Sequence, residues 1–127
     1  MRQRVETAAP WAATVGYSRA VRVNDTVHVA GTASVADDGS IAYPGDAYLQ
    51  ARRCLEIIVA ALREVGARPE HVVRTRMYVR SRSDWEAVGR AHGEVFTEIR
   101  PATTMVFAGF IDPDMLVEIE ADAIVTE

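Results

Sequence analysis

The stretch Asp46–Arg80, DAYLQARRCLEIIVAALREVGARPEHVVRTRMYVR, decides the fold, because its hydrophobic period changes from that of a helix to that of a strand. Up to Val65 the apolar residues recur every three or four positions, which predicts a helix with one apolar stripe. The stripe consists of Ala47, Ala51, Leu55, Ile58, Leu62 and Val65. Asp46 is a candidate N-cap and Gly66 a candidate C-terminal stop, and Pro69 prevents the helix from continuing.

From His71 to Arg80 the period is two, which predicts a strand with two different faces. One face should carry Val73, Thr75, Met77 and Val79. The other should carry Arg74, Arg76, Tyr78 and Arg80. An apolar side opposite a charged side predicts that one face of the sheet packs against the helix and the other does not.

The same two periods continue on either side of this stretch. Ser83 and Glu86 form a candidate capping box, which opens a second helix that Pro101 ends. The apolar stripe of this helix is Trp85, Val88, His92, Val95, Phe96 and Ile99. Period-two segments predict a hairpin over Ser18–Ala30 and two strands at the C-terminal end of the chain. Those strands are Thr103–Phe110 and Leu116–Val125.

The expected order is therefore ββ-α-β-α-ββ in a single domain over residues 1–127. Each helix has one apolar stripe and can cover only one face of a sheet. Short turns between strands favour an antiparallel or mixed sheet with the helices on one side. The sequence predicts an α+β fold, with a mixed, mostly antiparallel sheet and two helices on one face.

Composition excludes several classes of protein. The chain is 49% hydrophobic and 25% charged, as in an ordinary globular domain, and its net charge of -4 opposes nucleic-acid binding. Cys54 is the single cysteine, and the three histidines are scattered, so no metal site is expected. There is no signal-peptide pattern and no apolar run of membrane length, which favours a cytoplasmic protein.

The sheet face away from the helices combines opposite charges. Arg74, Arg76 and Arg80 lie on one predicted strand, and Glu118, Glu120 and Asp122 lie on another. Cross-strand ion pairs on a solvated face would explain this pattern. A half-buried interface between subunits, with charges that pair or bind a ligand, would explain it equally well.

Five segments, in register over roughly residues 15–125, resemble the Rid family, also called the YjgF/UK114 or endoribonuclease L-PSP-like family. The segments are Gly16–Val21, Val29–Thr32, Val72–Thr75, Pro101–Thr104 and Val117–Ala121. The resemblance implies a chorismate-mutase-like α+β fold, a homotrimer, and clefts between subunits that bind small molecules. The best-known members hydrolyse enamines and imines such as 2-aminoacrylate, and they need no metal or organic cofactor.

The resemblance also implies the site residues. Glu120 would place or activate water, and Tyr17 and the backbone near Gly31 would line the cleft. Thr103 and Thr104 could line the cleft and bond a ligand, and Met105 would give an apolar wall or core. In deaminase members an arginine that binds the substrate carboxylate follows the Pro-Ala pair, at the position of Thr103. A threonine hydroxyl cannot replace the bidentate, charge-assisted bonds of that arginine.

This departure leaves two functions open. The protein could be a hydrolase that deaminates an imine-like or carbonyl-type metabolite, with Arg74 of a neighbouring subunit as an alternative anion anchor. It could instead be a trimer that binds a small metabolite without chemistry. Endoribonuclease activity is disfavoured by the acidic balance and by the lack of a histidine pair that could act as acid and base.

Overall fold

The computed structural model describes residues 1–126, so that Glu127, the last residue of the predicted domain, lies outside the described residues. In chain order the main elements are β1 (Arg2–Val5), α1 (Ala12–Val15), β2 (Ala20–Val23), β3 (Thr26–Thr32), α2 (Ala47–Glu64), β4 (Val72–Val79), α3 (Trp85–Phe96), β5 (Ala102–Phe107) and β6 (Val117–Ile124). Short 3-10 helices precede β4 and α3, at Pro69–His71 and Arg82–Asp84.

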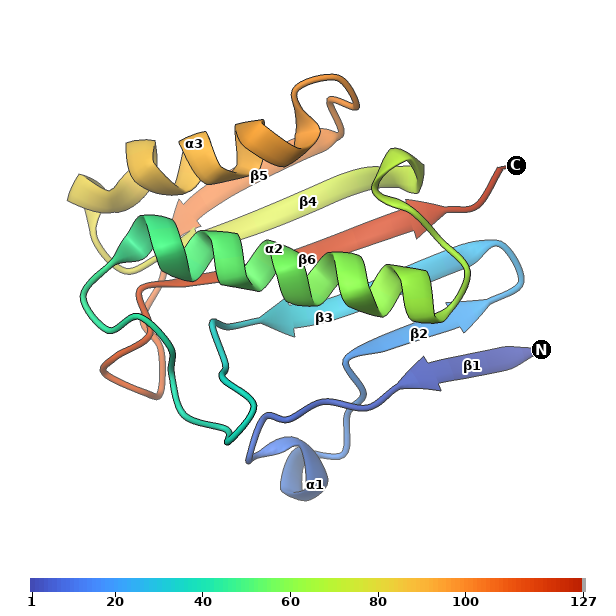
Figure 1. Cartoon of the computed structure of the whole chain (residues 1–127), viewed down its shortest axis with the longest axis horizontal. Helices are drawn as coiled ribbons and strands as arrows, with labels where there is room; N and C mark the ends of the chain where they lie inside the picture. Colours follow the sequence, from blue (N-terminus) through green and yellow to red (C-terminus); the bar gives the residue numbers. More distant parts are fainter. Residues whose placement is uncertain (127) are drawn as a thin grey trace.

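One six-stranded sheet forms the back layer, in the order β1-β2-β3-β6-β4-β5. Only β4 and β5 pair in parallel, and the other neighbours are antiparallel. Helices α2 and α3 lie side by side across one face of the sheet, and the two chain ends lie at the same side of the molecule (Figure 1). The predicted α+β class and helix placement are confirmed.

The sequence prediction missed β1 and α1. β1 has four residues, of which only Val5 is buried, so that it carries almost no hydrophobic signal. It nevertheless extends the sheet, because Arg2–Val5 pairs with Ala20–Val23. The segment that follows β1 folds back over the end of the sheet and forms one wall of the cavity described below.

Helix α2 begins and ends where its sequence indicates. The Asp46 carboxylate accepts a hydrogen bond from the Leu49 N–H at 2.9 Å, and Gly66 adopts a positive φ of 82° after the last turn. The core lies between this helix, α3 and the sheet, and its largest fully buried apolar side chains include Leu55, Ile58 and Leu62.

Two local predictions were wrong. A register shift between β4 and β6 turns Val73 outward, where it is 45% exposed, and Val72 enters the core instead. The capping box at Ser83 does not form, because Arg82–Asp84 is a 3-10 turn in which Ser81 accepts the hydrogen bond from the Ser83 N–H. α3 therefore starts at Trp85 with no side-chain cap.

Within residues 1–126, none of the helices has both the length and the apolar character that crossing a bilayer requires.

Candidate functional site

A cavity of about 140 Å³ opens at the end of β3, between the N-terminal segment, the sheet and α2. Its wall combines apolar and ionisable side chains, which is the usual make-up of a small-molecule site. The lining residues are Glu6, Thr7, Ala8, Ala9, Trp11, Tyr17, Arg19, Gly31, Thr32, Ala33, Val35, Arg53, Ile57 and Glu118. The structure thus brings together two of the predicted site residues, Tyr17 and Gly31.

Gly31 and Glu118 meet across an irregularity in the sheet. The register between β3 and β6 shifts between Val29 and Thr32, which gives β3 a bulge at Ala30 and Gly31. A Cβ atom at Gly31 would lie 2.9 Å from the carboxyl carbon of Glu118. The glycine therefore gives the Glu118 carboxyl the room to lie against the strand.

Burial raises the pKa of Glu118 above its ordinary range, and the negative charge of Glu120 adds to this effect, while Arg19 works against it. The same carboxyl borders a second hollow, of about 180 Å³, which the loop before β6 lines through Phe110 and Met115. A carboxyl that is half-buried, accessible from a cavity and more readily protonated than usual is suited both to accept and to return a proton.

Arg19 contributes a buried positive charge to the same cavity. Its Nη1 donates to the Gly31 carbonyl at 2.9 Å and to the Thr32 hydroxyl at 2.6 Å, so that it braces the bulge. The Tyr17 ring lies 5.8 Å from its Cζ. Burial lowers the pKa of Arg19, but an arginine side chain stays protonated at any physiological pH.

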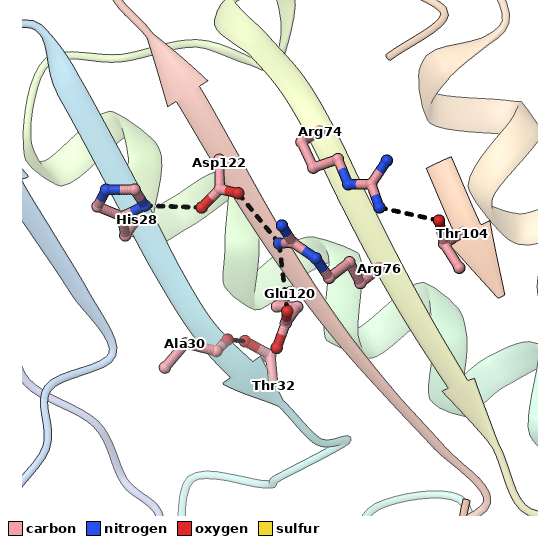
Figure 2. Close-up of polar contacts among 8 residues, drawn as sticks. All are labelled: His28, Ala30, Thr32, Arg74, Arg76, Thr104, Glu120 and Asp122. Atoms are coloured by element: carbon pink, nitrogen blue, oxygen red, sulfur yellow. Dashed lines mark hydrogen bonds and ion pairs between the residues drawn. The ribbon is translucent and has the colours of Figure 1, made fainter. Parts of the chain in front are cut away.

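Glu120, the predicted catalytic residue, lies on the outer face of the sheet and not in this cavity. Figure 2 shows its carboxylate beside Arg76, which approaches Glu120 Oε1 at 3.3 Å and Asp122 Oδ2 at 3.1 Å. Asp122 also contacts His28 Nδ1, at 2.7 Å. Of the three arginines expected to face these carboxylates, only Arg76 pairs with them.

The other two arginines of β4 have different partners. Arg74 donates from Nη2 to the Thr104 hydroxyl at 2.9 Å, on the same outer face (Figure 2). Arg80 donates to the backbone carbonyls of Met115 and Asp112, at 2.7 and 2.8 Å, and so holds the loop before β6.

Thr103 faces the helices, and its hydroxyl is already engaged. It donates to the Pro101 carbonyl at 3.1 Å and contacts the Thr75 hydroxyl at 2.7 Å, which in turn lies 2.8 Å from His92 Nε2. Because a hydroxyl has a single proton, Thr103 must accept from Thr75, and Thr75 must accept from a protonated His92 Nε2. The Thr103 proton is thus committed to Pro101. Burial lowers the pKa of His92, which favours the neutral ring, and the tautomer with the proton on Nε2 fits this chain of bonds.

The predicted site residues therefore form two groups in one chain. Tyr17 and Gly31 line the cavity at the end of β3, whereas Thr103, Thr104 and Met105 lie on the edge strand β5, and β6 and β4 lie between the two groups. Three strand spacings separate β3 from β5, or roughly 14 Å. One chain alone cannot bring both groups to a single small ligand.

Among the described residues, no group of three His, Cys, Asp or Glu side chains is placed to hold a metal ion.

The sequence interpretation missed two residues of the cavity. Glu118 has the same strand parity as Glu120, so alternation places both on one face and cannot tell which reaches the cavity. The bulge in β3 decides this, and a glycine inside a strand is its only local signal. Arg19 directly precedes β2 and is only 5% exposed. Arginine is seldom buried, and the sequence interpretation did not expect it to be buried here.

Three comparisons place the chain among known proteins. The family model described as endoribonuclease L-PSP matches residues 6–125. The crystal structure of Rv2704 from Mycobacterium tuberculosis, a member of the YjgF/YER057c/UK114 family, superposes with a TM-score of 0.87 at 44% identity and covers 98% of this chain and 100% of that one. SCO2049 of Streptomyces coelicolor is 42% identical over 123 residues, which are 95% of this chain and 90% of that protein. The 3-aminoacrylate deaminase RutC of Acinetobacter baylyi is 31% identical over 107 residues, covering 84% of this chain and 85% of that protein.

Proposed function

Since this chain belongs to the endoribonuclease L-PSP family, the family of the YjgF/UK114 or Rid proteins, we propose that it hydrolyses a small enamine or imine and releases ammonia. The observation that carries the proposal is the position of Glu118, a carboxyl with a raised pKa held over Gly31 in a cavity of small-molecule size. The similarity to a 3-aminoacrylate deaminase agrees with this chemistry.

The proposed reaction needs one group that moves protons. An enamine takes up a proton on carbon and loses one from nitrogen to become an imine, and water then adds to the imine carbon. Glu118 accepts a proton of that water and passes it to the nitrogen, which gives a carbinolamine. Transfer of the remaining hydroxyl proton to the nitrogen by the same carboxyl then breaks the carbon–nitrogen bond, with ammonia as the leaving group. The product is a carbonyl compound, and no electrons are gained or lost. Glu118 takes the role that the sequence suggested for Glu120, because Glu118 is the carboxyl that lines the cavity.

The experiment is a measurement of ammonia release from freshly generated 2-aminoacrylate and 3-aminoacrylate. We expect release faster than the spontaneous hydrolysis measured in the same buffer. Release at the spontaneous rate, together with thermal stabilisation by the carbonyl products, would overturn the enzymatic proposal in favour of a metabolite-binding function.

The proposal includes a homotrimer, as the family resemblance implies. The exposed apolar side chains near the edge strand β5 support an interface at this edge. Trp85 and Phe107 are 53% and 52% exposed, and with Met105 and Val106 they line one hollow. A neighbouring copy seated here would cover this surface and bring β5 of one chain to the cavity of another.

Phe107→Glu tests this interface. We expect the wild-type protein to sediment at three times the chain mass of 13.9 kDa, and the variant to sediment at a lower mass, because a charge would be buried in an apolar contact. Val15→Glu, an exposed apolar residue at the end of α1, is the matched control and should leave the mass unchanged. A wild-type monomer, or an unchanged mass for Phe107→Glu, would contradict the proposed interface.

RNA cleavage does not form part of the proposal, despite the name of the family. The net charge is -4, and the cations of the outer face are engaged with carboxylates, hydroxyls and carbonyls. Phosphate backbones are bound by surfaces with an excess of positive charge, whereas on this face Arg76 is paired with the carboxylates of Glu120 and Asp122.

A further inference from the structure

The Arg19 side chain is only 5% exposed, and part of its hydrogen-bonding capacity is unused. Its two bonds to the β3 bulge both come from Nη1, and the buried Nε–H has no partner within residues 1–126. No ion pair of Arg19 occurs in the part of the chain that the structure describes. A buried guanidinium without an anion is unusual, because a charge removed from water is normally paired.

The second arginine of the cavity is in a different situation. Arg53 lies within ion-pair distance of Asp37 and Glu56, at 3.6 Å each, and donates to the Val35 carbonyl at 3.1 Å. Its charge is already balanced by the protein. Arg19 is therefore the cation of this cavity that has capacity left for a ligand.

Glu118 faces the same cavity but does not satisfy Arg19. The two charges influence one another's pKa, yet their atoms are not within ion-pair distance, and the cavity borders both side chains. A ligand with an anionic end and a reactive end could therefore contact Arg19 with the first and Glu118 with the second.

The cavity also limits the size of that ligand. A void of about 150 Å³ accommodates a benzene molecule, so a cavity of this kind holds about six non-hydrogen atoms. The volume here is about 140 Å³. A three-carbon amino or imino acid has a size of this order, whereas a dicarboxylate with a five-carbon chain does not fit.

We propose that Arg19 is the carboxylate-binding residue of this protein, in place of the arginine that is absent at Thr103, and that the ligand is a monocarboxylate of three or four carbons. The reactive group at Glu118 rests on the proposed function, but the binding of the carboxylate to Arg19 does not require any turnover. The position of the anchor, on the strand side of the cavity and within the same chain, also means that no residue of β5 is needed to hold the carboxylate.

The test measures binding, with propionate as the probe and propionamide as its uncharged isostere. For the wild-type protein we expect propionate, titrated by NMR with the Trp11 indole signal as reporter, to bind at least tenfold more tightly than propionamide. Arg19→Gln should reduce the affinity for propionate about 10- to 100-fold and leave that for propionamide nearly unchanged. 2-Oxoglutarate should bind more weakly than propionate.

The control is Arg22→Gln on the neighbouring strand. Arg22 also donates to backbone carbonyls, those of Asn24 and Val65 at 2.7 and 2.6 Å, but it does not line the cavity. This variant should lose stability and keep the affinity for propionate. Equal affinities of the wild-type protein for propionate and propionamide would overturn the proposal even if Arg19→Gln does not fold.

The result can be separated from that of the ammonia assay. Binding that depends on Arg19 without ammonia release would leave this inference standing and remove the enzymatic function. Ammonia release by the wild-type protein, together with carboxylate binding that is unaffected in Arg19→Gln, would support the enzymatic function and overturn this inference.

Discussion

Glu118→Gln is expected to lose activity and to gain stability. If Glu118 moves the proton between water and the leaving nitrogen, its replacement by a group that cannot titrate should lower kcat/KM for ammonia release about 100- to 10,000-fold. The isosteric amide still fits over Gly31, so the loss would report the chemistry and not a displaced strand.

The gain in stability follows from the direction of the pKa shift. Burial raises the pKa of Glu118 in the folded protein above its ordinary value of 4.5. Its favourable contribution to folding is therefore complete below pH 4.5 and is lost as the pH rises through the folded-state pKa. Thermal unfolding from pH 4 to 8 should show that Glu118→Gln exceeds the wild-type protein in Tm at pH 8 and that the difference shrinks toward pH 4.

Glu120→Gln is the matched control on the same strand face. It removes one contact of Arg76, which retains Asp122 at 3.1 Å, and pairs of this kind on a surface contribute at most about 1 kcal/mol. We expect activity close to that of the wild-type protein. A large loss of activity in Glu120→Gln with normal activity in Glu118→Gln would return the catalytic role to Glu120.

Gln50→Leu is expected to cause the largest loss of stability. Gln50 is fully buried in α2, where its Nε2 donates to the carbonyls of Tyr43 and Asp114 at 3.1 and 2.9 Å, and its Oε1 accepts from the Leu116 N–H at 2.9 Å. Leucine would leave the Asp114 carbonyl and the Leu116 N–H without these bonds, whereas the Tyr43 carbonyl still accepts from the Asp46 N–H at 3.1 Å. At about 1–3 kcal/mol for each of these two groups, the free energy of unfolding should fall by at least about 2 kcal/mol.

Denaturant unfolding measures this effect, with Arg52→Leu as the control on the same helix. Arg52 is exposed and pairs with Glu94 at 3.2 Å, so its loss should cost less than about 1 kcal/mol. Because Asp114 and Leu116 belong to the loop that leads into β6, Gln50→Leu should also weaken the affinity for propionate. A stability loss equal to that of Arg52→Leu would show that these three bonds contribute little.

The sequence was sufficient for the elements that carry a long hydrophobic period. α2 has a clear stripe, an aspartate at its start and a glycine after its end, so local and tertiary preferences agree. β1 has too few residues and too little burial to show a period. Val73 illustrates a second limit, since a bulge in the sheet exchanges the inward and outward positions that strict alternation assigns.

The site was harder to predict than the fold, because its geometry depends on contacts between distant segments. Strand parity placed Glu118 and Glu120 on one face, but only the bulge beside Gly31 brings Glu118 into the cavity. The resemblance drew attention to the threonine at position 103. It could not reveal that Arg19, from the other end of the sheet, lies in the cavity with an unpaired donor.

The chain of bonds from His92 through Thr75 and Thr103 to Pro101 has a consequence for how this branch of the family could have diverged. An arginine at position 103 would deprive the Thr75 hydroxyl of its acceptor inside the core, so this exchange cannot be neutral as a single step. We expect a single exchange between threonine and arginine at this position to lower the stability of the fold. The exchange would then require coordinated changes at Thr75 and His92. Relatives that carry the arginine should then differ at those two buried positions as well, and a lineage with the threonine chain would keep it even after its original substrate had disappeared.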